Sequence, residues 1–477
     1  MNYWILVACI AGVFALYGLV RFVICRNSPA AKYAFDKVLK VLVIVYCVIV
    51  FLSVLLPDFI TLSQSKEFLG SGTMQGYALV RWFSSVCFVV LPIAVFFKNR
   101  TIRNIAIYFG IAITIVQIVY FPQYLESATS TLGRGLNSIS IMPEGVKEFL
   151  INPTFRMVIF AITVVMQISI PIILVFQEKH FFKVTSLKEW GKFLLTLPCL
   201  IFAALPIYVP QYLFGHSEVM FEAFSLPHIL WLVAVFVLLF VLYFVFRKKS
   251  AETQRILLLV LSLCLVFQYF QMFGAISISL KRLPLQLCNL GAFFILFSLI
   301  SMNKKLFNFT VIINVVGVIF ALAMPDLDGE GFFYLYNMHF ILEHTNVLII
   351  PVLALMFGLF PRLNWKALIH ALVGFTIYFL VVWALGTTFN AIATATGNSF
   401  YSANYLFMFD GEVAADLLPF TKALFDIKYV VGSATFYPVI QVLVYAVFVV
   451  VCLILFLAIR LIYFIKDKAM RKKVKTA

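Results

Sequence analysis

Charged residues are scarce in this chain, and acidic residues are scarcer than basic ones. Asp, Glu, Lys and Arg together make up 12% of the 477 residues, with 20 Asp and Glu against 36 Lys and Arg. A soluble domain carries about 25% charged residues. Hydrophobic residues reach 64% of the chain. This composition is not that of a soluble globular protein and indicates a chain that lies in a membrane.

The sequence also lacks the signals of disulfide frameworks, metal sites and soluble enzymes. All eight cysteines lie in or at the edge of apolar stretches, and no two have the Cys-x-x-Cys spacing of metal ligands. We therefore expect neither structural disulfides nor a bound metal. There is no G-x-G-x-x-G, Walker loop, His-Glu-x-x-His or nucleophile elbow, so we expect no nucleotide or other cofactor.

What the chain has in abundance is long apolar stretches. Thirteen of them are long enough, or nearly so, to cross a hydrocarbon core of roughly 30 Å at about 1.5 Å per residue. We therefore predict an all-α fold, a polytopic membrane helix bundle of about 13 transmembrane helices. The predicted spans are 3–24, 38–57, 76–97, 104–121, 155–177, 192–213, 226–246, 255–278, 284–302, 308–324, 337–360, 366–390 and 434–464.

Positive charge gathers in the loops on one side of these spans. This pattern predicts a multi-pass protein of the cell membrane with its N-terminus outside and its C-terminus in the cytoplasm. The first span, which no basic residue precedes, is then a retained helix and not a signal peptide. The basic loops and tail face an anionic inner leaflet, so the net charge of +16 does not indicate nucleic-acid binding. The segments that hold 27 of the 36 Lys and Arg are Arg21–Lys40, Lys98–Arg103, Lys179–Lys192, Arg247–Arg255, Lys304–Lys305, Arg362–Lys366 and the tail from Arg460.

Landmarks recur in the same order in the two halves of the chain. Trp4 and Trp231 each open a span that a basic loop follows, and Pro171 and Pro351 lie inside the fifth and eleventh spans. We predict a duplication into two parallel six-helix repeats plus one extra C-terminal helix, since an even number of spans preserves orientation. The predicted domains are a degenerate N-terminal repeat (1–220), a membrane domain with the candidate site (221–465) and a basic cytoplasmic tail (466–477).

Polar residues at membrane depth are costly and are therefore candidates for function. Cys288 lies four residues past Pro284, about 6 Å along its helix, and His344 lies seven residues past Asn337, about 10 Å along its own. The two side chains are thus predicted to lie at similar depths. The polar residues of the second half are His228, Gln268, Gln271, Gln286, Cys288, Asn289, Glu343 and His344.

A cysteine and a histidine within reach of each other are the minimal set of side chains for nucleophilic acyl transfer. The imidazole accepts the thiol proton, the thiolate attacks an ester carbonyl, and the imidazolium returns the proton to the leaving alcohol. The alternative interpretation is that the cysteine only packs and the histidine only bonds to a neighbouring helix. We predict Cys288 and His344 as catalytic residues, and as substrate-binding or oxyanion groups Gln286, Asn289, Gln268, Gln271, His228 and Glu343.

Two motifs of the second half carry a family resemblance. Phe221–His228 and Leu283–Leu290 resemble motifs of the YwaF-type bacterial integral membrane proteins, and the resemblance covers about 220–464. That family is similar to eukaryotic transmembrane protein 164, described as a phospholipid acyltransferase that uses a cysteine. It is more distantly similar to androgen-induced membrane hydrolases of fatty esters. The resemblance implies Cys288 as nucleophile and His344 as base, and the chain has Gln286 where the family pattern has His.

The leading hypothesis is therefore a lipid acyltransferase or lipid-ester hydrolase that acts on membrane lipids from the outer face. A secondary transporter built from two parallel six-helix halves is one alternative. The polar residues argue against it, because they cluster in one half near one face. A non-catalytic scaffold that binds lipid or a partner helix is the other alternative.

Overall fold

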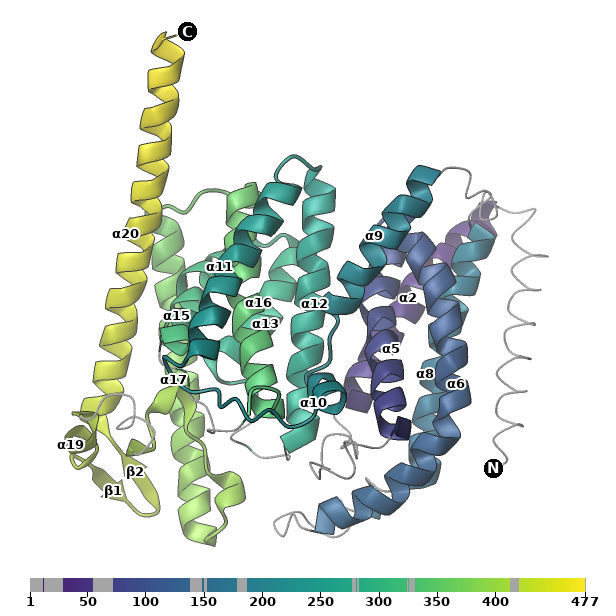
Figure 1. The fold of residues 1–477 in the computed structure, drawn as a ribbon. Coiled ribbons are helices and arrows are strands. Elements are labelled where there is room, and N and C mark those ends of the chain that lie inside the picture. Colours follow the sequence, from purple (N-terminus) through teal and green to yellow (C-terminus); the bar gives the residue numbers. More distant parts are fainter. Residues whose placement is uncertain are drawn as a thin grey trace. The chain divides into compact units, whose positions relative to one another are not determined.

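The structure is a computed structural model, and it describes most of the helical part of the chain (Figure 1). Among the described residues, nine helices are long and apolar enough to cross a membrane, so the chain is a multi-pass integral membrane protein. The residues described are 12, 29–54, 72–137, 148–149, 152–177, 187–276, 280, 283–323, 325, 331–411 and 420–476. The nine helices are Met74–Phe96, Arg100–Pro122, Pro153–Val175, Leu226–Phe246, Ala251–Met272, Lys304–Ala323, Leu335–Phe357, Trp365–Thr396 and Pro438–Ala469.

Three further helices coincide with predicted spans. They are α2 (Pro29–Val54), α9 (Leu187–Ala203) and α13 (Leu287–Ser301). The predicted first span, 3–24, lies outside the described residues except for residue 12. The all-α membrane fold is thus confirmed, while the total of thirteen spans and the two repeats stay predictions.

The chain divides into two compact units that do not follow a single cut in the sequence. The first unit contains Phe267–Ser277 and Gly331–His339 in addition to the N-terminal 218 residues, and the second unit contains the remainder. The predicted domains 1–220, 221–465 and 466–477 therefore stay a proposal. The predicted tail is itself helical, because α20 (Pro438–Thr476) runs through the 465/466 boundary as one helix.

The first unit is built on α5 (Gly72–Phe96), which packs against α2 and α6 (Arg100–Asn137). In turn, α6 packs against α8 (Pro153–Gln177). The membrane span of α6 ends at Pro122, next to the end of the predicted span 104–121, while the helix itself continues to Asn137. A proline removes one backbone donor and kinks a helix without always ending it.

The predicted span 192–213 is not one helix. It ends as α9 at Ala203, and α10 (Val209–Phe214) begins after an interruption that contains Pro206. An interruption at membrane depth is tolerated where protein groups satisfy the freed backbone atoms. Side chains of α5 do so here: Trp82 Nε1 donates to the Ile201 carbonyl at 2.6 Å, and Ser85 Oγ donates to the Ala204 carbonyl at 2.5 Å.

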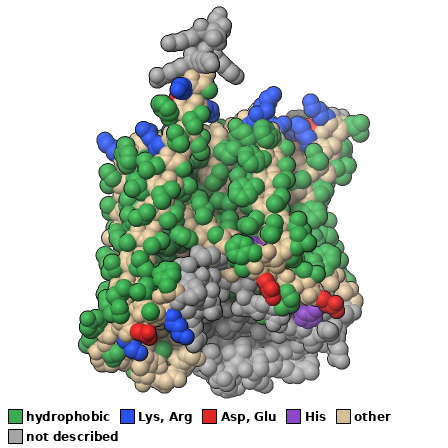
Figure 2. All heavy atoms as spheres, turned by 60° about the vertical axis from the view of Figure 1, so that its left-hand side comes forward, with side chains coloured by type: hydrophobic (Ala, Val, Ile, Leu, Met, Phe, Trp, Pro, Cys, Tyr) green, Lys and Arg blue, Asp and Glu red, His purple; other side chains and the backbone are tan. Residues whose placement is uncertain are grey.

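The second unit contains α11 (Leu226–Phe246), the first part of α12 (Ala251–Ile276), α13, most of α16 (Leu335–Phe357), α17 (Trp365–Thr396) and α20. A further membrane span is one continuous helix that changes from α to π and back to α. It consists of α14 (Lys304–Phe309), a π-helical turn η2 (Thr310–Asn314) and α15 (Val315–Ala323). In Figure 2, hydrophobic side chains cover much of the helix surfaces.

The segment between α17 and α20 is structured where it is described. It begins with short 3₁₀ turns, η3 (Ser399–Tyr401) and η4 (Tyr405–Phe407), and continues after a gap with α19 (Thr421–Phe425). An antiparallel hairpin follows, β1 (Tyr429–Val431) and β2 (Ala434–Phe436), in which Val431 pairs with Ala434. Its turn holds Gly432 at φ +61°, a conformation that glycine adopts without strain. β2 packs against α17.

Candidate functional site

Cys288 lies in the first turn of α13. The helix begins after Gln286, whose backbone is extended, and Leu290 N–H donates to the Gln286 carbonyl to close the first turn. The first N–H groups of a helix have no partner within the helix, and they carry the positive end of its dipole. Cys288 is a partly exposed residue of this first turn, where backbone donors can stabilise negative charge.

Two polar side chains from other helices act electrostatically on the Cys288 thiol. They are Glu343 of α16 and Tyr378 of α17. The Glu343 side chain is buried, and Tyr378 donates its hydroxyl to the Leu285 carbonyl at 2.6 Å. Of the predicted polar residues, Glu343 thus lies within electrostatic range of Cys288. Tyr378 was not predicted, because a tyrosine in an apolar helix gives no separate signal.

The ring of His344 has a defined tautomer. Its Nδ1 lies 2.8 Å from the Phe340 carbonyl oxygen, one turn earlier in α16. A carbonyl can only accept, so Nδ1 carries the proton and Nε2 is the ring atom that can accept one. The Phe340 ring packs on the imidazole at 4.1 Å between centroids, which further fixes its orientation. His344 is therefore held in the form that a general base requires.

Asn314, at the end of the π-helical turn, is a polar neighbour that the sequence prediction missed. It donates from Nδ2 to the Leu287 carbonyl at 2.6 Å, one residue before Cys288. A Cβ at Gly291 would lie 2.7 Å from Asn314 Nδ2, so this approach requires glycine. The Asn314 Oδ1 atom is buried and has no hydrogen-bond partner among the described residues. Single turns of π-helix occur frequently at functional sites. The feature of the sequence that could have identified Asn314 is an asparagine within an apolar span.

Gln286 anchors the η4 segment to the start of α13. Its Nε2 donates to the Asn404 carbonyl at 3.0 Å, and its Oε1 accepts from the Leu406 N–H at 3.0 Å. Tyr405 donates its hydroxyl to the Leu280 carbonyl. The Gln286 amide was predicted as an oxyanion donor. Its nitrogen and its oxygen are both bonded to backbone atoms. Asn289 follows Cys288 in the first turn and is partly buried.

His228 has both ring nitrogens engaged. Its Nδ1 accepts from the Phe224 N–H at 2.9 Å, so the proton is on Nε2, which donates to the Leu322 carbonyl at 3.0 Å. The side chain is completely buried. It connects the start of α11 to the end of α15, and it holds Phe224 at φ +60°. His228 therefore acts as a structural bridge in the second unit.

Gln268 and Gln271 lie in the first unit, whereas Cys288 and His344 lie in the second. Gln268 Nε2 donates to the Leu205 carbonyl at 2.9 Å, and Gln271 Oε1 accepts from the Ile207 N–H at 3.0 Å. Both side chains therefore bind the interruption between α9 and α10. A group of His, Cys, Asp and Glu that could hold a metal is absent from the described part of the chain.

Residues 223–459 match the model of the TMEM164 family. The match contains Cys288, Glu343, His344 and their neighbours, and it supports the resemblance to transmembrane protein 164 over this half of the chain. No curated protein and no solved structure matches the chain.

Proposed function

We propose that this protein transfers or hydrolyses the acyl chains of membrane lipid esters, with Cys288 as nucleophile and His344 as base. The observation that carries the proposal is the bond from His344 Nδ1 to the Phe340 carbonyl, which leaves Nε2 as the proton acceptor. Support comes from the position of Cys288 in the first turn of α13 and from the family match that includes both residues. The apolar surroundings fit a substrate that resides in the bilayer.

The reaction proceeds in two balanced steps. In the first, His344 Nε2 accepts the Cys288 thiol proton, and the sulfur attacks the ester carbonyl. The lipid alcohol leaves with that proton, and a thioester remains on Cys288. In the second, an acceptor alcohol gives its proton to His344 and attacks the thioester, which forms a new ester and restores the thiol. Water as the acceptor releases a fatty acid instead.

The start of α13 supplies the electrostatics of these steps. The backbone N–H groups of its first turn and the Asn289 side chain are the proposed donors for the oxyanion that forms at the ester carbonyl. Glu343 has a different role, because a carboxylate beside the thiol opposes negative charge on sulfur. It favours a resting state in which Cys288 is protonated until His344 accepts the proton.

The proposed side of action is the outer leaflet. The charge pattern of the loops places the N-terminus outside, and α13 then begins at the outer face and ends toward Lys304 and Lys305 inside. The protein is accordingly proposed to reside in the cell membrane. The anionic inner leaflet contacts its basic loops and tail.

A secondary transporter is a second candidate, which the interruption between α9 and α10 favours. Discontinuous helices form the substrate sites of many transporters built from repeats. At this interruption, Gln268 Oε1 and Gln271 Nε2 are buried and lack hydrogen-bond partners among the described residues. If the predicted parallel repeats exist, a polar substrate would bind to these amides.

The proposal is tested by acyl turnover of the purified full chain in lipid nanodiscs that contain a broad set of glycerolipids. Wild type is compared with Cys288→Ser and His344→Ala, and with Cys264→Ser and His370→Ala as matched controls. We expect turnover and a hydroxylamine-sensitive acyl adduct that the first two variants lose and the controls keep. Folded wild type without turnover on any lipid would overturn the enzyme proposal in favour of the transporter or a lipid-binding scaffold.

A further inference from the structure

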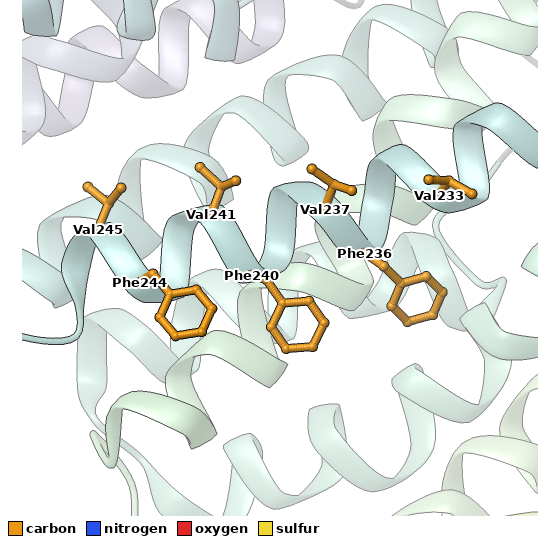
Figure 3. Close-up of a pocket in the computed structure, with 7 residues that line it drawn as sticks. All are labelled: Val233, Phe236, Val237, Phe240, Val241, Phe244 and Val245. Atoms are coloured by element: carbon orange, nitrogen blue, oxygen red, sulfur yellow. The ribbon is translucent and has the colours of Figure 1, made fainter.

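The exposed surface of α11 carries a shallow apolar groove of about 600 Å³ (Figure 3). Its walls are two rows of side chains at i, i+4 spacing, which follow the helix as parallel ridges. In Figure 3, valine side chains project to one side of α11 and phenylalanine rings to the other. Each of these side chains is about half exposed. The lining residues are Val233, Phe236, Val237, Phe240, Val241, Phe244 and Val245.

The groove has the length of one lipid acyl chain within a leaflet. From Val233 to Val245 the helix rises about 18 Å at roughly 1.5 Å per residue. One leaflet contributes about half of a hydrocarbon core of roughly 30 Å. The helix has a mean hydropathy of 3.1 and only 17% of its span is buried, so its face is directed to an apolar environment. An acyl chain that lies between the two ridges fits this environment.

Positive charge lies at one end of the groove. Arg247, Lys248 and Lys249 follow the last groove residues and are exposed, and Glu252 is the acidic residue before Arg255. The Arg247 guanidinium carbon lies 4.8 Å from the Phe244 ring centroid, which holds this cation over the groove wall. Gln254 Nε2 donates to the Phe246 carbonyl at 3.1 Å and so fixes the turn that presents the three cations.

We propose that α11 binds an anionic phospholipid, with one acyl chain in the groove and the phosphate at Arg247–Lys249. The charge of the turn selects the occupant. A zwitterionic lipid would fill the groove but bring no net negative charge to the three cations, whereas an anionic lipid supplies both an acyl chain and a net negative charge. A guanidinium pairs with two phosphate oxygens at once, and the ammonium groups add attraction. The site is separate from Cys288 and does not depend on the proposed reaction.

The test is lipid binding to the purified full chain by native mass spectrometry, with phosphatidylglycerol compared with phosphatidylcholine of the same acyl chains. We expect preferential retention of phosphatidylglycerol. Arg247→Ala/Lys248→Ala/Lys249→Ala should lower its affinity about a hundredfold, at about fivefold per cation near an anionic lipid. The same variant should leave phosphatidylcholine binding unchanged. Val237→Phe/Val241→Phe, which fills the groove, should weaken both lipids several-fold.

Matched controls are Lys304→Ala/Lys305→Ala in another basic loop and Leu238→Phe on α11 outside the groove. Both should bind like wild type, and thermal unfolding verifies that every variant is folded. Equal retention of the two lipids by wild type, or an equal loss in the Lys304/Lys305 control, would overturn the proposal. So would a dimer of the chain that Val237→Phe/Val241→Phe dissociates without any change in lipid binding, because the groove would then be occupied by a second copy.

Discussion

Two histidines of the second unit differ in which ring nitrogen carries the proton. In His228 both nitrogens are bonded, to the Phe224 N–H and the Leu322 carbonyl. In His344 the bond to the Phe340 carbonyl uses the protonated Nδ1 and leaves Nε2 to accept. A general base accepts a proton on its unprotonated nitrogen, so Nε2 is the atom of His344 that the proposed reaction would use, whereas His228 bridges two backbone groups.

Alanine at these two positions should therefore have opposite effects. His228→Ala removes the partner of the buried Leu322 carbonyl and of the Phe224 N–H, and it should cost about 1–2 kcal/mol of stability, the upper range for bonds within a membrane. His344→Ala should change stability less and abolish acyl turnover. Thermal unfolding and turnover in nanodiscs, measured on both variants, check this. Full stability of His228→Ala would contradict the assigned bridge.

The charge of Glu343 should control the reactivity of Cys288. Glu343→Gln removes a negative charge that opposes the thiolate, so Cys288 should react about tenfold faster with a membrane-permeant maleimide, the equivalent of about 1.4 kcal/mol of relieved repulsion. Cys288→Ser gives the background from other cysteines, and Glu252→Gln is the acidic control. Slower labelling of Glu343→Gln would identify Glu343 as the base instead.

At the scale of elements, hydrogen bonds from the start of α13 and from α17 hold the residues in and around η4. Gln286 at the start of α13 bonds to Asn404 and Leu406, while Asn390 of α17 bonds to both the N–H and the carbonyl of Ala403. Leu406 and Phe407 have left-handed backbone conformations, which cost energy in non-glycine residues. These bonds offset that cost and keep the segment against the helix that carries Cys288.

The same docking predicts a requirement for Gly386 in α17. A Cβ at this position would overlap the Phe409 ring, which is buried. Gly386→Ala should displace Phe409 and cost about 1–3 kcal/mol, the usual range for overpacking, although alanine favours a helix. Thermal unfolding and proteolysis of the η4 segment measure the effect. Gly317→Ala is the control, because its Cβ would meet Leu287 Cβ at an ordinary 3.4 Å; equal stability of both variants would contradict the requirement.

For the whole molecule, the important feature is that the first unit includes two segments from the second half of the chain. Phe267–Ser277, which includes the end of α12, belongs to the first unit although it is encoded in the second half. Gln268 and Gln271 from this segment satisfy the backbone of the α9–α10 interruption. A cut between residues 218 and 219 would remove these partners from the first unit.

Residues 1–218 expressed alone should therefore be unstable in the membrane and should be recovered on co-expression with residues 219–477. In the intact chain, Gln268→Leu/Gln271→Leu should cost about 1–2 kcal/mol, since each bond within a membrane is worth about 0.6 kcal/mol on average and up to about 1.7. Thermal unfolding and size-exclusion profiles check both expectations. Ser262→Ala is the control, because Ser262 bonds only to its own helix at the Leu258 carbonyl. A stable, monodisperse 1–218 fragment would contradict the dependence of the first unit on Phe267–Ser277.

Part of the candidate site was predictable from the sequence. A cysteine, an adjacent Glu-His pair and several amides in apolar spans stand out because polar groups are costly there. Asn314 and Tyr378 were not identified as neighbours of Cys288, since their proximity depends on how separate helices pack. Gln268 and Gln271 were grouped with Cys288 because they share a stretch of sequence, yet their bonds are to residues about sixty positions earlier.

By itself, the sequence determined that this is a multi-pass helical membrane protein, because hydropathy and helix length are local properties of the chain. It also offered Cys288 and His344 as candidate catalytic residues, and that assignment stays a proposal. Only the tertiary structure decided which nitrogen of each histidine is engaged, which unit each glutamine belongs to, and what holds the η4 segment at the start of α13. The reason is physical: a hydrogen bond is set by the packing of helices, and Gln286 and its partner Leu406 are 120 residues apart.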